Sequence, residues 1–166
     1  MISKSLGKEI IEGCGRIFIR ETKIEDIPKL ATLKLKMFQD ANKENLLREN
    51  FLEEVEIKYF DLYKRKKATH FVIENNNEII ACAGAFIKED LPYCFYKQSE
   101  YGFIGDVYVT NNFRRKGLAQ GLTHKTLEWF STKNIQTVRL LASEDAKELY
   151  KAFGFEETDQ MILNLE

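Results

Sequence analysis

The chain has 166 residues and a mass of 19.4 kDa, the size of one ordinary domain with a single core. Apolar residues make up 44% and charged residues 31%, with only 9 Gly and 2 Pro, which excludes collagen-like, low-complexity and wholly disordered chains. The 25 Lys and Arg balance 26 Asp and Glu, so no overall field recruits nucleic acid or an anionic membrane. We expect a single domain spanning residues 1–166.

The cysteine pattern and the N-terminus bear on the compartment. Cys14, Cys82 and Cys94 form no CxxC pair, and no basic start followed by a long apolar run and a cleavage site is present. The apolar stretch Ile79–Phe86 is far shorter than the roughly 20 residues of a membrane span. These features favour a reduced, cytoplasmic protein with no membrane segment.

Metal binding has little support in the sequence. His70 and His124 are the only histidines, and they are too few and too far apart to predict a zinc site. We expect each to be a surface or structural residue, and we expect no metal.

The first elements are predicted from short-range patterns. Partial alternation in Arg16–Arg20 predicts a short strand. Thr22 and Asp26 then provide start signals for a helix that reaches Phe38. Pro28 must lie in the first turn of this helix, because deeper inside it would lose a hydrogen bond and clash with the preceding turn.

A second helix and a hairpin follow. Apolar spacing predicts a helix over Asn45–Lys67. Its basic end, Lys64–Lys67, suits the helix dipole, and a solvated helix end explains it better than a nucleic-acid patch. The runs His70–Glu74 and Glu78–Ile87, joined by three Asn residues, predict a β-hairpin.

The second half alternates strands and helices. After a loop over Lys88–Ser99, a strand is predicted at Tyr101–Thr110, and its alternation places Ile104, Asp106 and Tyr108 on one face. Helical spacing returns at Leu118. The remaining predicted elements are a strand at Thr137–Ala142, a short helix stopped by Gly154, and a last strand at Met161–Leu165. This order predicts an α/β or α+β sheet with helices on its faces.

The junction VYVTNNFRRKGLAQ, residues 107–120, has the features of an anion site. Arg114, Arg115 and Lys116 bring positive charge to the start of a helix, where unpaired N–H groups and the helix dipole favour an anion. The small residues Gly117 and Ala119 let a phosphate approach the backbone. From these residues alone, a solvated basic turn that starts a helix is an equal alternative.

Two common phosphate motifs do not fit. A P-loop needs GxxxxGK[ST], and the junction has no Lys-Ser or Lys-Thr pair after its glycine. The nearest candidate for GxGxxG is Gly13 with Gly15, which precedes a strand and lacks the third glycine.

The junction and a later segment together resemble the GNAT superfamily of acyl-CoA-dependent N-acyltransferases. Arg114, Gly117 and Ala119 fill the family's pyrophosphate signature of Arg or Gln, two residues, Gly, one residue, then Gly or Ala. The segment ASEDAKELYKAFGFEE is similar to the family's later motif, in which a helix containing A-x-x-L-Y ends in a Gly-Phe pair. With an opening like RxTxxD at Arg20 and Thr22, the resemblance covers Arg16 to Leu165.

The resemblance implies a mixed, mostly antiparallel sheet that is splayed between its fourth and fifth strands, with acyl-CoA in the gap. It implies that the backbone of the fourth strand pairs with the pantetheine arm and that the backbone before and within the helix start holds the pyrophosphate. Ser143 stands where many members have an Asn that contacts the pantetheine. The implied cofactor-binding residues are Val107, Tyr108, Val109, Arg114, Arg115, Lys116, Gly117, Leu118, Ala119, Ser143 and Tyr150.

The implied chemistry assigns two catalytic candidates. With reference pKa values of about 8.5 for a thiol and about 10 for tyrosine, Tyr150 suits protonation of the leaving CoA thiolate. Asp106, or Glu100 through a water, is the candidate base, and each has the alternative of a solvated strand residue. Deprotonation through ordered water alone is a further alternative.

The expected function is transfer of an acetyl group from the co-substrate acetyl-CoA to a primary amine, by direct attack in a ternary complex. The acceptor is a small-molecule amine or a protein amino group. The candidate lining residues are Phe38, Tyr59, Tyr63, Tyr93, Phe95 and Tyr96, and for each of them core packing is the favoured alternative. A non-catalytic acyl-CoA-binding regulatory module is the alternative, and a nucleic-acid binder is the weakest interpretation. A homodimer is a further expectation from the family, without a signature in the sequence.

Overall fold

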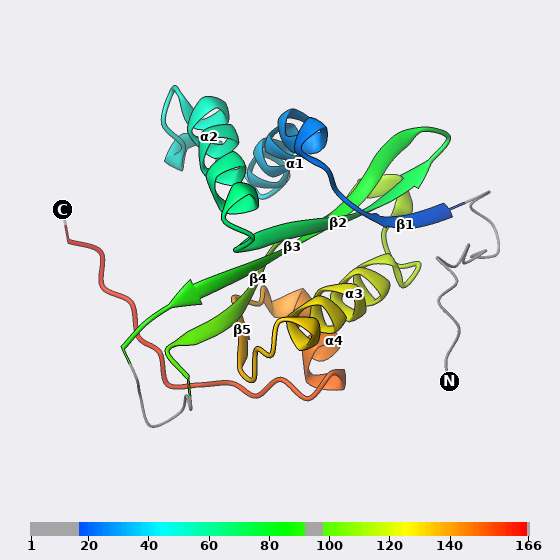
Figure 1. Ribbon diagram of the computed structural model, residues 1–166. Helices are drawn as coiled ribbons and strands as arrows, with labels where there is room; N and C mark the ends of the chain where they lie inside the picture. The colour runs from blue at the N-terminus through cyan, green and yellow to red at the C-terminus, as the bar shows by residue number, and fades with distance from the viewer. Residues whose placement is uncertain (1–16, 92–97, 166) are drawn as a thin grey trace.

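Five strands and four α-helices follow one another in the computed structural model, which describes residues 17–91 and 98–165 (Figure 1). Short 3-10 turns lie at Ile24–Asp26, Glu44–Leu46, Asn111–Phe113 and Glu144–Ala146. The longer elements are β1 (Ile17–Glu21), α1 (Ile27–Asp40), α2 (Phe51–Lys64), β2 (Ala68–Asn75), β3 (Glu78–Glu89), β4 (Glu100–Val109), α3 (Leu118–Thr132), β5 (Val138–Leu140) and α4 (Lys147–Ala152).

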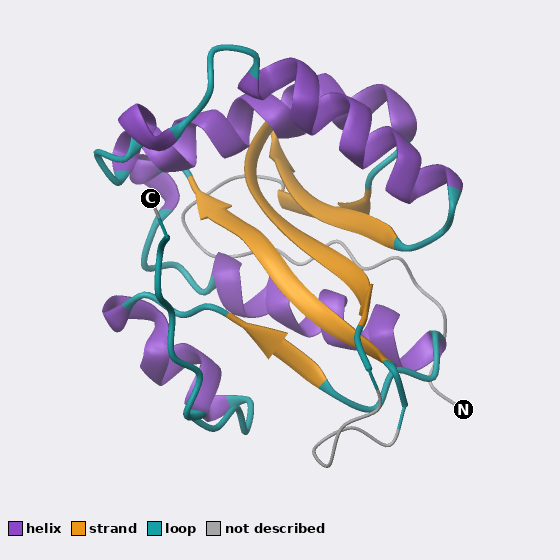
Figure 2. Ribbon diagram, turned by 90° about the vertical axis from the view of Figure 1, so that its left-hand side faces the viewer, coloured by secondary structure: helices purple, strands orange, loops and turns teal. Residues whose placement is uncertain are grey.

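The strands form one sheet in the order β1-β2-β3-β4-β5. Neighbouring strands are antiparallel except β4 and β5, which are parallel. Helices α1 and α2 cover one face, and α3 and α4 cover the other (Figures 1 and 2). The predicted mixed, mostly antiparallel sheet flanked by helices is therefore confirmed. None of the helices in residues 17–91 and 98–165 combines the length and apolar character needed to cross a membrane.

The sheet opens between β4 and β5. These two strands pair at only three positions, of which the last joins Ile104 to Leu140. From Gly105 to Val109, β4 continues without a β5 partner in the described chain, while its other edge stays paired with β3. The predicted splay between the fourth and fifth strands is present.

A β-bulge interrupts β4 at the same level. Cys82 of β3 is paired with Tyr108, but Gly84, two residues later, is paired with Gly105. Two residues of β4 therefore face one residue of β3, which defines a bulge. Asp106, the first of the two, has φ 54°, in the left-handed region that few non-glycine residues adopt.

The bulge changes which side chains share a face. Ile104 and Val107 pack in the clusters beneath α3, whereas Tyr108 packs with residues of α1, and Asp106 bonds to side chains of α1 and α2. The prediction that Ile104 shares a face with Asp106 is therefore wrong, because one extra residue shifts the alternation of the strand.

Two apolar cores hold the layers together. Leu118 and Leu122 of α3 pack on Ile17 and Ile73 of the sheet, and Leu122 is fully buried. On the other face Leu30 of α1 belongs to a cluster with residues of α2 and the sheet. The contacts fix the first turn of α3 against the strands.

One predicted helix start and one predicted strand are wrong. The second helix begins at Phe51 and not at Asn45, because Leu47 has an extended backbone (ψ 146°) after a single 3-10 turn. Met161–Leu165 forms no strand, and four of its side chains are 74–93% exposed. Cys14, Cys94 and the predicted pocket residues Tyr93, Phe95 and Tyr96 lie outside the described residues.

We predict that Leu122→Ala lowers the free energy of unfolding by about 2–5 kcal/mol, because it leaves a cavity between α3 and the sheet. Denaturant unfolding measures this change. Leu46→Ala is the control, since Leu46 is 70% exposed and its truncation should change stability by at most about 0.5 kcal/mol. Equal losses in the two variants would contradict the placement of Leu122.

Candidate active site

The start of α3 presents main-chain N–H groups to solvent. Gly117 occupies the N-cap position with φ 76°, and Arg115 also has a positive φ of 62°. A Cβ on Gly117 would meet nothing within 4 Å, so the backbone conformation and not the space favours glycine here. The first hydrogen bond of the helix runs from Gly121 N to Gly117 O at 3.1 Å, and the N–H groups of the first turn have no helical acceptor.

Core packing sets the direction of these groups. Leu118 is 2% exposed and anchors the first turn on the sheet, whereas Arg115, Lys116 and Gly117 are exposed. Ala119 is half-buried and too small to cover the helix end. The turn therefore offers unpaired donors, a favourable dipole and two exposed cations at one place, which suits a phosphate.

Arg114 has a structural role in holding this turn. Its Nε donates to Val109 O at 2.8 Å and its Nη2 donates to the Asp40 carboxylate at 2.9 Å. Tyr108 Oη donates to the same carboxylate at 2.7 Å. Burial, together with this hydrogen bond to Asp40, raises the pKa of Tyr108 to about 12. These contacts join the end of α1 to the end of β4.

The bulge turns one peptide group of β4. The Cys82 thiol, which lies in the cluster under α1, donates to Asp106 O at 3.2 Å. In a trans peptide the N–H of the next residue points opposite to the carbonyl, so the Val107 N–H points away from this thiol. With the β5 edge of β4 open beyond Ile104, the main chain at 107–109 borders the gap between the strands.

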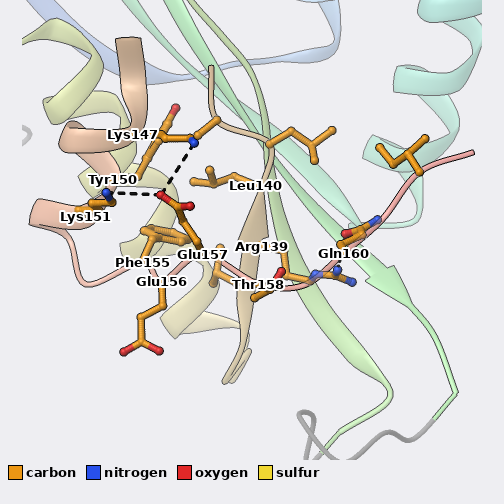
Figure 3. A pocket seen from close by; sticks show the side chains of 14 residues that line it. Arg139, Leu140, Lys147, Tyr150, Lys151, Phe155, Glu156, Glu157, Thr158 and Gln160 are labelled. Carbon is orange, nitrogen blue, oxygen red and sulfur yellow. Dashed lines mark hydrogen bonds and ion pairs between the residues drawn. The ribbon is translucent and has the colours of Figure 1, made fainter. Parts of the chain in front are cut away.

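Tyr150 lies on the α3–α4 side of the sheet. It is 6% exposed, its ring meets that of Phe155 edge-on at 5.9 Å, and burial raises its pKa. A cavity of about 400 Å³ between β5, α4 and residues 155–162 is lined by Tyr150 and Leu140 (Figure 3). No residue of the α3 start lines this cavity, so a ligand in contact with both Tyr150 and that turn has to be extended.

Ser143 lies three residues beyond the end of β5, just before the 3-10 turn at Glu144–Ala146. It is exposed, and its carbonyl accepts a hydrogen bond from Ala146 N at 3.0 Å at the start of the turn before α4. It therefore lies on the connection between the strand that borders the gap and the helix that carries Tyr150.

Asp106 lies on the opposite face from Tyr150. Its side chain is 5% exposed, and its carboxylate accepts hydrogen bonds from Lys34 Nζ, Tyr59 Oη and His70 Nε2, the last at 3.0 Å. Burial alone would raise the pKa of Asp106, but the His70 hydrogen bond and the Lys34 charge hold it below its usual range. Glu100, the second candidate base, forms an ion pair with Lys67.

The sequence did not indicate the partners of Asp106. Lys34 and Tyr59 sit on helices within ordinary amphipathic patterns, and His70 opens an apolar strand run. His124, in contrast, pairs with Glu128 on the surface of α3 at 3.1 Å. Among residues 17–91 and 98–165, no group of three or more His, Cys, Asp or Glu is arranged to hold a metal ion.

Comparison with known proteins gives the family. The sequence profile of the acetyltransferase (GNAT) family matches residues 35–155, which include β4, the α3 start and α4. The chain belongs to the GNAT family. No curated protein matches it.

Solved structures share the fold of this GNAT domain. A predicted acetyltransferase from Clostridium acetobutylicum with acetyl-CoA is 24% identical, with a TM-score of 0.80 over 90% of this chain and 96% of the other. A GCN5-related N-acetyltransferase from Ralstonia eutropha is 22% identical, with a TM-score of 0.76 over 90% and 98%. The aminoglycoside N-acetyltransferase AAC(6')-Iy in complex with CoA is 17% identical, with a TM-score of 0.73 over 95% and 99%.

Proposed function

We propose that this GNAT domain transfers an acetyl group from acetyl-CoA to a primary amine by direct attack in a ternary complex. The observation that carries the proposal is the open edge of β4 beyond Ile104, which leads directly to the exposed first turn of α3. The similar structures from Clostridium and of AAC(6')-Iy contain acetyl-CoA and CoA, respectively, which supports this choice of co-substrate.

The cofactor would bind mainly through the main chain. In the proposed complex the N–H groups at 115–119 hold the pyrophosphate, with the charges of Arg115 and Lys116 close by. The pantetheine arm pairs with the open edge of β4 at Val107, Tyr108 and Val109, and Ser143 flanks it from the end of β5. Arg114 contributes by holding the turn.

The chemistry requires four events. The amine loses a proton, its nitrogen attacks the thioester carbonyl carbon to form the C–N bond, the C–S bond breaks, and the leaving thiolate gains a proton. The Val107 N–H points away from the Cys82 thiol, and in the proposed complex it donates to the carbonyl oxygen as negative charge develops there. Tyr150 carries its proton at neutral pH, as any tyrosine with a pKa of about 10 or above does, and burial raises its pKa further; it donates this proton to the departing thiolate.

The group that accepts the proton of the amine is less well supported than the proton donor Tyr150. Asp106 stays a predicted base, but its lone pairs face three donors on the α1–α2 side. Deprotonation by ordered water agrees better with these contacts, because proximity of amine and thioester supplies much of the rate.

Calorimetric titration with acetyl-CoA tests the cofactor. We predict one site per chain and binding at least about 100-fold weaker for acetyl-pantetheine without the pyrophosphate, since each lost hydrogen bond to a charged group is worth about 1.5–3 kcal/mol. Gly117→Ala should weaken acetyl-CoA binding. Gly154→Ala is the matched control, because Gly154 also has a positive φ (91°) and no atom within 4 Å of the position that a Cβ would take, yet lies away from the α3 start.

Absence of acetyl-CoA binding at millimolar concentration would overturn the proposal. Binding without thiol release across a broad amine panel would instead support the non-catalytic acyl-CoA-binding module. Binding that is weakened equally by both alanine variants would remove the assignment of the pyrophosphate to the α3 start.

We predict that Tyr150→Phe lowers kcat about 100-fold while acetyl-CoA affinity changes little, because the variant loses a proton donor and keeps the ring. Thiol release with saturating amine measures kcat, and calorimetry measures affinity. Tyr101→Phe on β4 is the control for loss of a phenol oxygen. An unchanged kcat in Tyr150→Phe would remove Tyr150 from the mechanism.

We also propose that the chain forms a homodimer through residues 161–165. Met161, Ile162, Leu163 and Leu165 are 74–93% exposed on one segment, and Leu141, just after β5, is 73% exposed; exposed apolar side chains grouped in this way suit an interaction surface. The Arg139 guanidinium bonds Gln160 at 2.7 Å beside β5, and the chain then leaves the sheet (Figure 1). In the described chain β5 is an edge strand, and its outer edge has no partner strand. In the proposed dimer, residues 161–165 of each copy pack beside the β5 edge of the other copy, in a reciprocal two-fold arrangement.

Sedimentation or light scattering tests the dimer. We predict twice the chain mass of 19.4 kDa for the natural sequence and a monomer for Leu163→Glu, since a buried carboxylate opposes the contact. Leu46→Glu, at a comparably exposed leucine far from this segment in sequence, should stay dimeric. A monomeric natural protein at about 100 μM, a concentration far above the affinities typical of stable dimers, or a dimeric Leu163→Glu, would contradict the proposal.

A further inference from the structure

A closed polar cluster lies behind the β4 bulge, on the face opposite Tyr150. Lys34 of α1, Tyr59 of α2 and His70 of β2 all donate to the carboxylate of Asp106. His70 is fully buried and Tyr59 is 4% exposed. Three separate elements therefore converge on one buried charge.

A consistent proton arrangement exists for the whole cluster. His70 Nδ1 lies 2.7 Å from Tyr63 Oη, which lies 2.6 Å from Thr22 Oγ1. With a proton on Nε2, His70 donates to Asp106, while Thr22 Oγ1 donates to His70 O at 3.0 Å and accepts from His70 N at 3.2 Å. Asp106 thereby accepts from three side chains, and the positive charge of Lys34 lies beside its carboxylate.

The cluster acts on the backbone that faces the gap. A positive φ at a non-glycine residue persists only where the surroundings hold it, and Asp106 has φ 54°. Its side chain is held by three donors and its carbonyl by the Cys82 thiol. Both ends of this residue are therefore fixed, and with them the direction of the Val107 N–H.

We propose that Asp106, held by Lys34, Tyr59 and His70, is a positioning residue that aims the Val107 N–H at the thioester oxygen from the opposite face of the sheet. This inference rests on the proposed acetyl transfer. It also distinguishes two roles for Asp106, because a base must reach the amine, whereas a positioning residue acts through the peptide group that follows it.

The test compares Asp106→Asn with Leu33→Ala. Leu33 is 4% exposed in the same α1–α2 cluster, and its truncation supplies a loss of stability without removing the charge. We expect Asp106→Asn to lower kcat about 10- to 100-fold, since small misplacement of a reacting group costs this much, with the KM for acetyl-CoA within about twofold. The pH profile should keep its shape. Leu33→Ala should have the same kcat as the unsubstituted protein when both are assayed below the melting temperature of the variant.

Three results of the kinetic measurements would overturn the inference. These are a natural kcat in Asp106→Asn, an equal loss in Leu33→Ala, and disappearance of the acidic limb of the pH profile in Asp106→Asn, which would instead establish Asp106 as the base. Hydrogen exchange separates this inference from the proposed function. If the unsubstituted protein releases no thiol with any amine, the proposed acetyl transfer is wrong. Faster exchange of the amides at 104–109 in Asp106→Asn, but not in Leu33→Ala, would still support the positioning role of Asp106. Unchanged exchange in Asp106→Asn would refute that role.

Discussion

The rotated peptide between Asp106 and Val107 is the constraint on which the site depends. Because β4 has one residue more than β3 at this level, the strand presents Ile104 to α3 before the bulge and Asp106 to α1 and α2 at it. The bulge lies just past Ile104, which is the last residue of β4 that pairs with β5. The bulge and the gap therefore occur together, and main-chain groups released from the ladder border the gap.

The polar cluster behind the bulge explains how the backbone conformation at Asp106 is maintained. An unpaired buried carboxylate is costly, and so is any single donor left without its acceptor, so the cluster is stable only in the arrangement in which all partners meet. Apolar residues of the same volume would fill the space under α1 and α2 but would tolerate several positions of β4. A buried charge with donors from three elements specifies one position.

Local sequence patterns predicted much of the fold, but features that depend on contacts between distant parts of the chain were not predicted. The hairpin, the α3 start at Gly117 and the stop at Gly154 were predictable because each depends on a few neighbouring residues. The bulge was not, because it arises from the register of two strands and Asp106 carries no local sign of it. The partners of Asp106 were missed for the same reason, since Lys34 lies 72 residues away in sequence.

The short β5 divides the site into two parts with different physical demands. Since pairing with β4 ends at Leu140, the chain turns through Ser143 and a 3-10 turn into α4, which places Tyr150 at a cavity lined by β5 and α4 and away from the α3 start. Exposed N–H groups at α3 favour a charged, strongly hydrated group that stays in contact with solvent. The buried phenol of Tyr150, in the proposed reaction, suits a proton transfer shielded from water. In the proposed complex one extended ligand meets both demands by running along the open edge of β4, so the length of β5 would set where the ligand lies and where its reacting end stops.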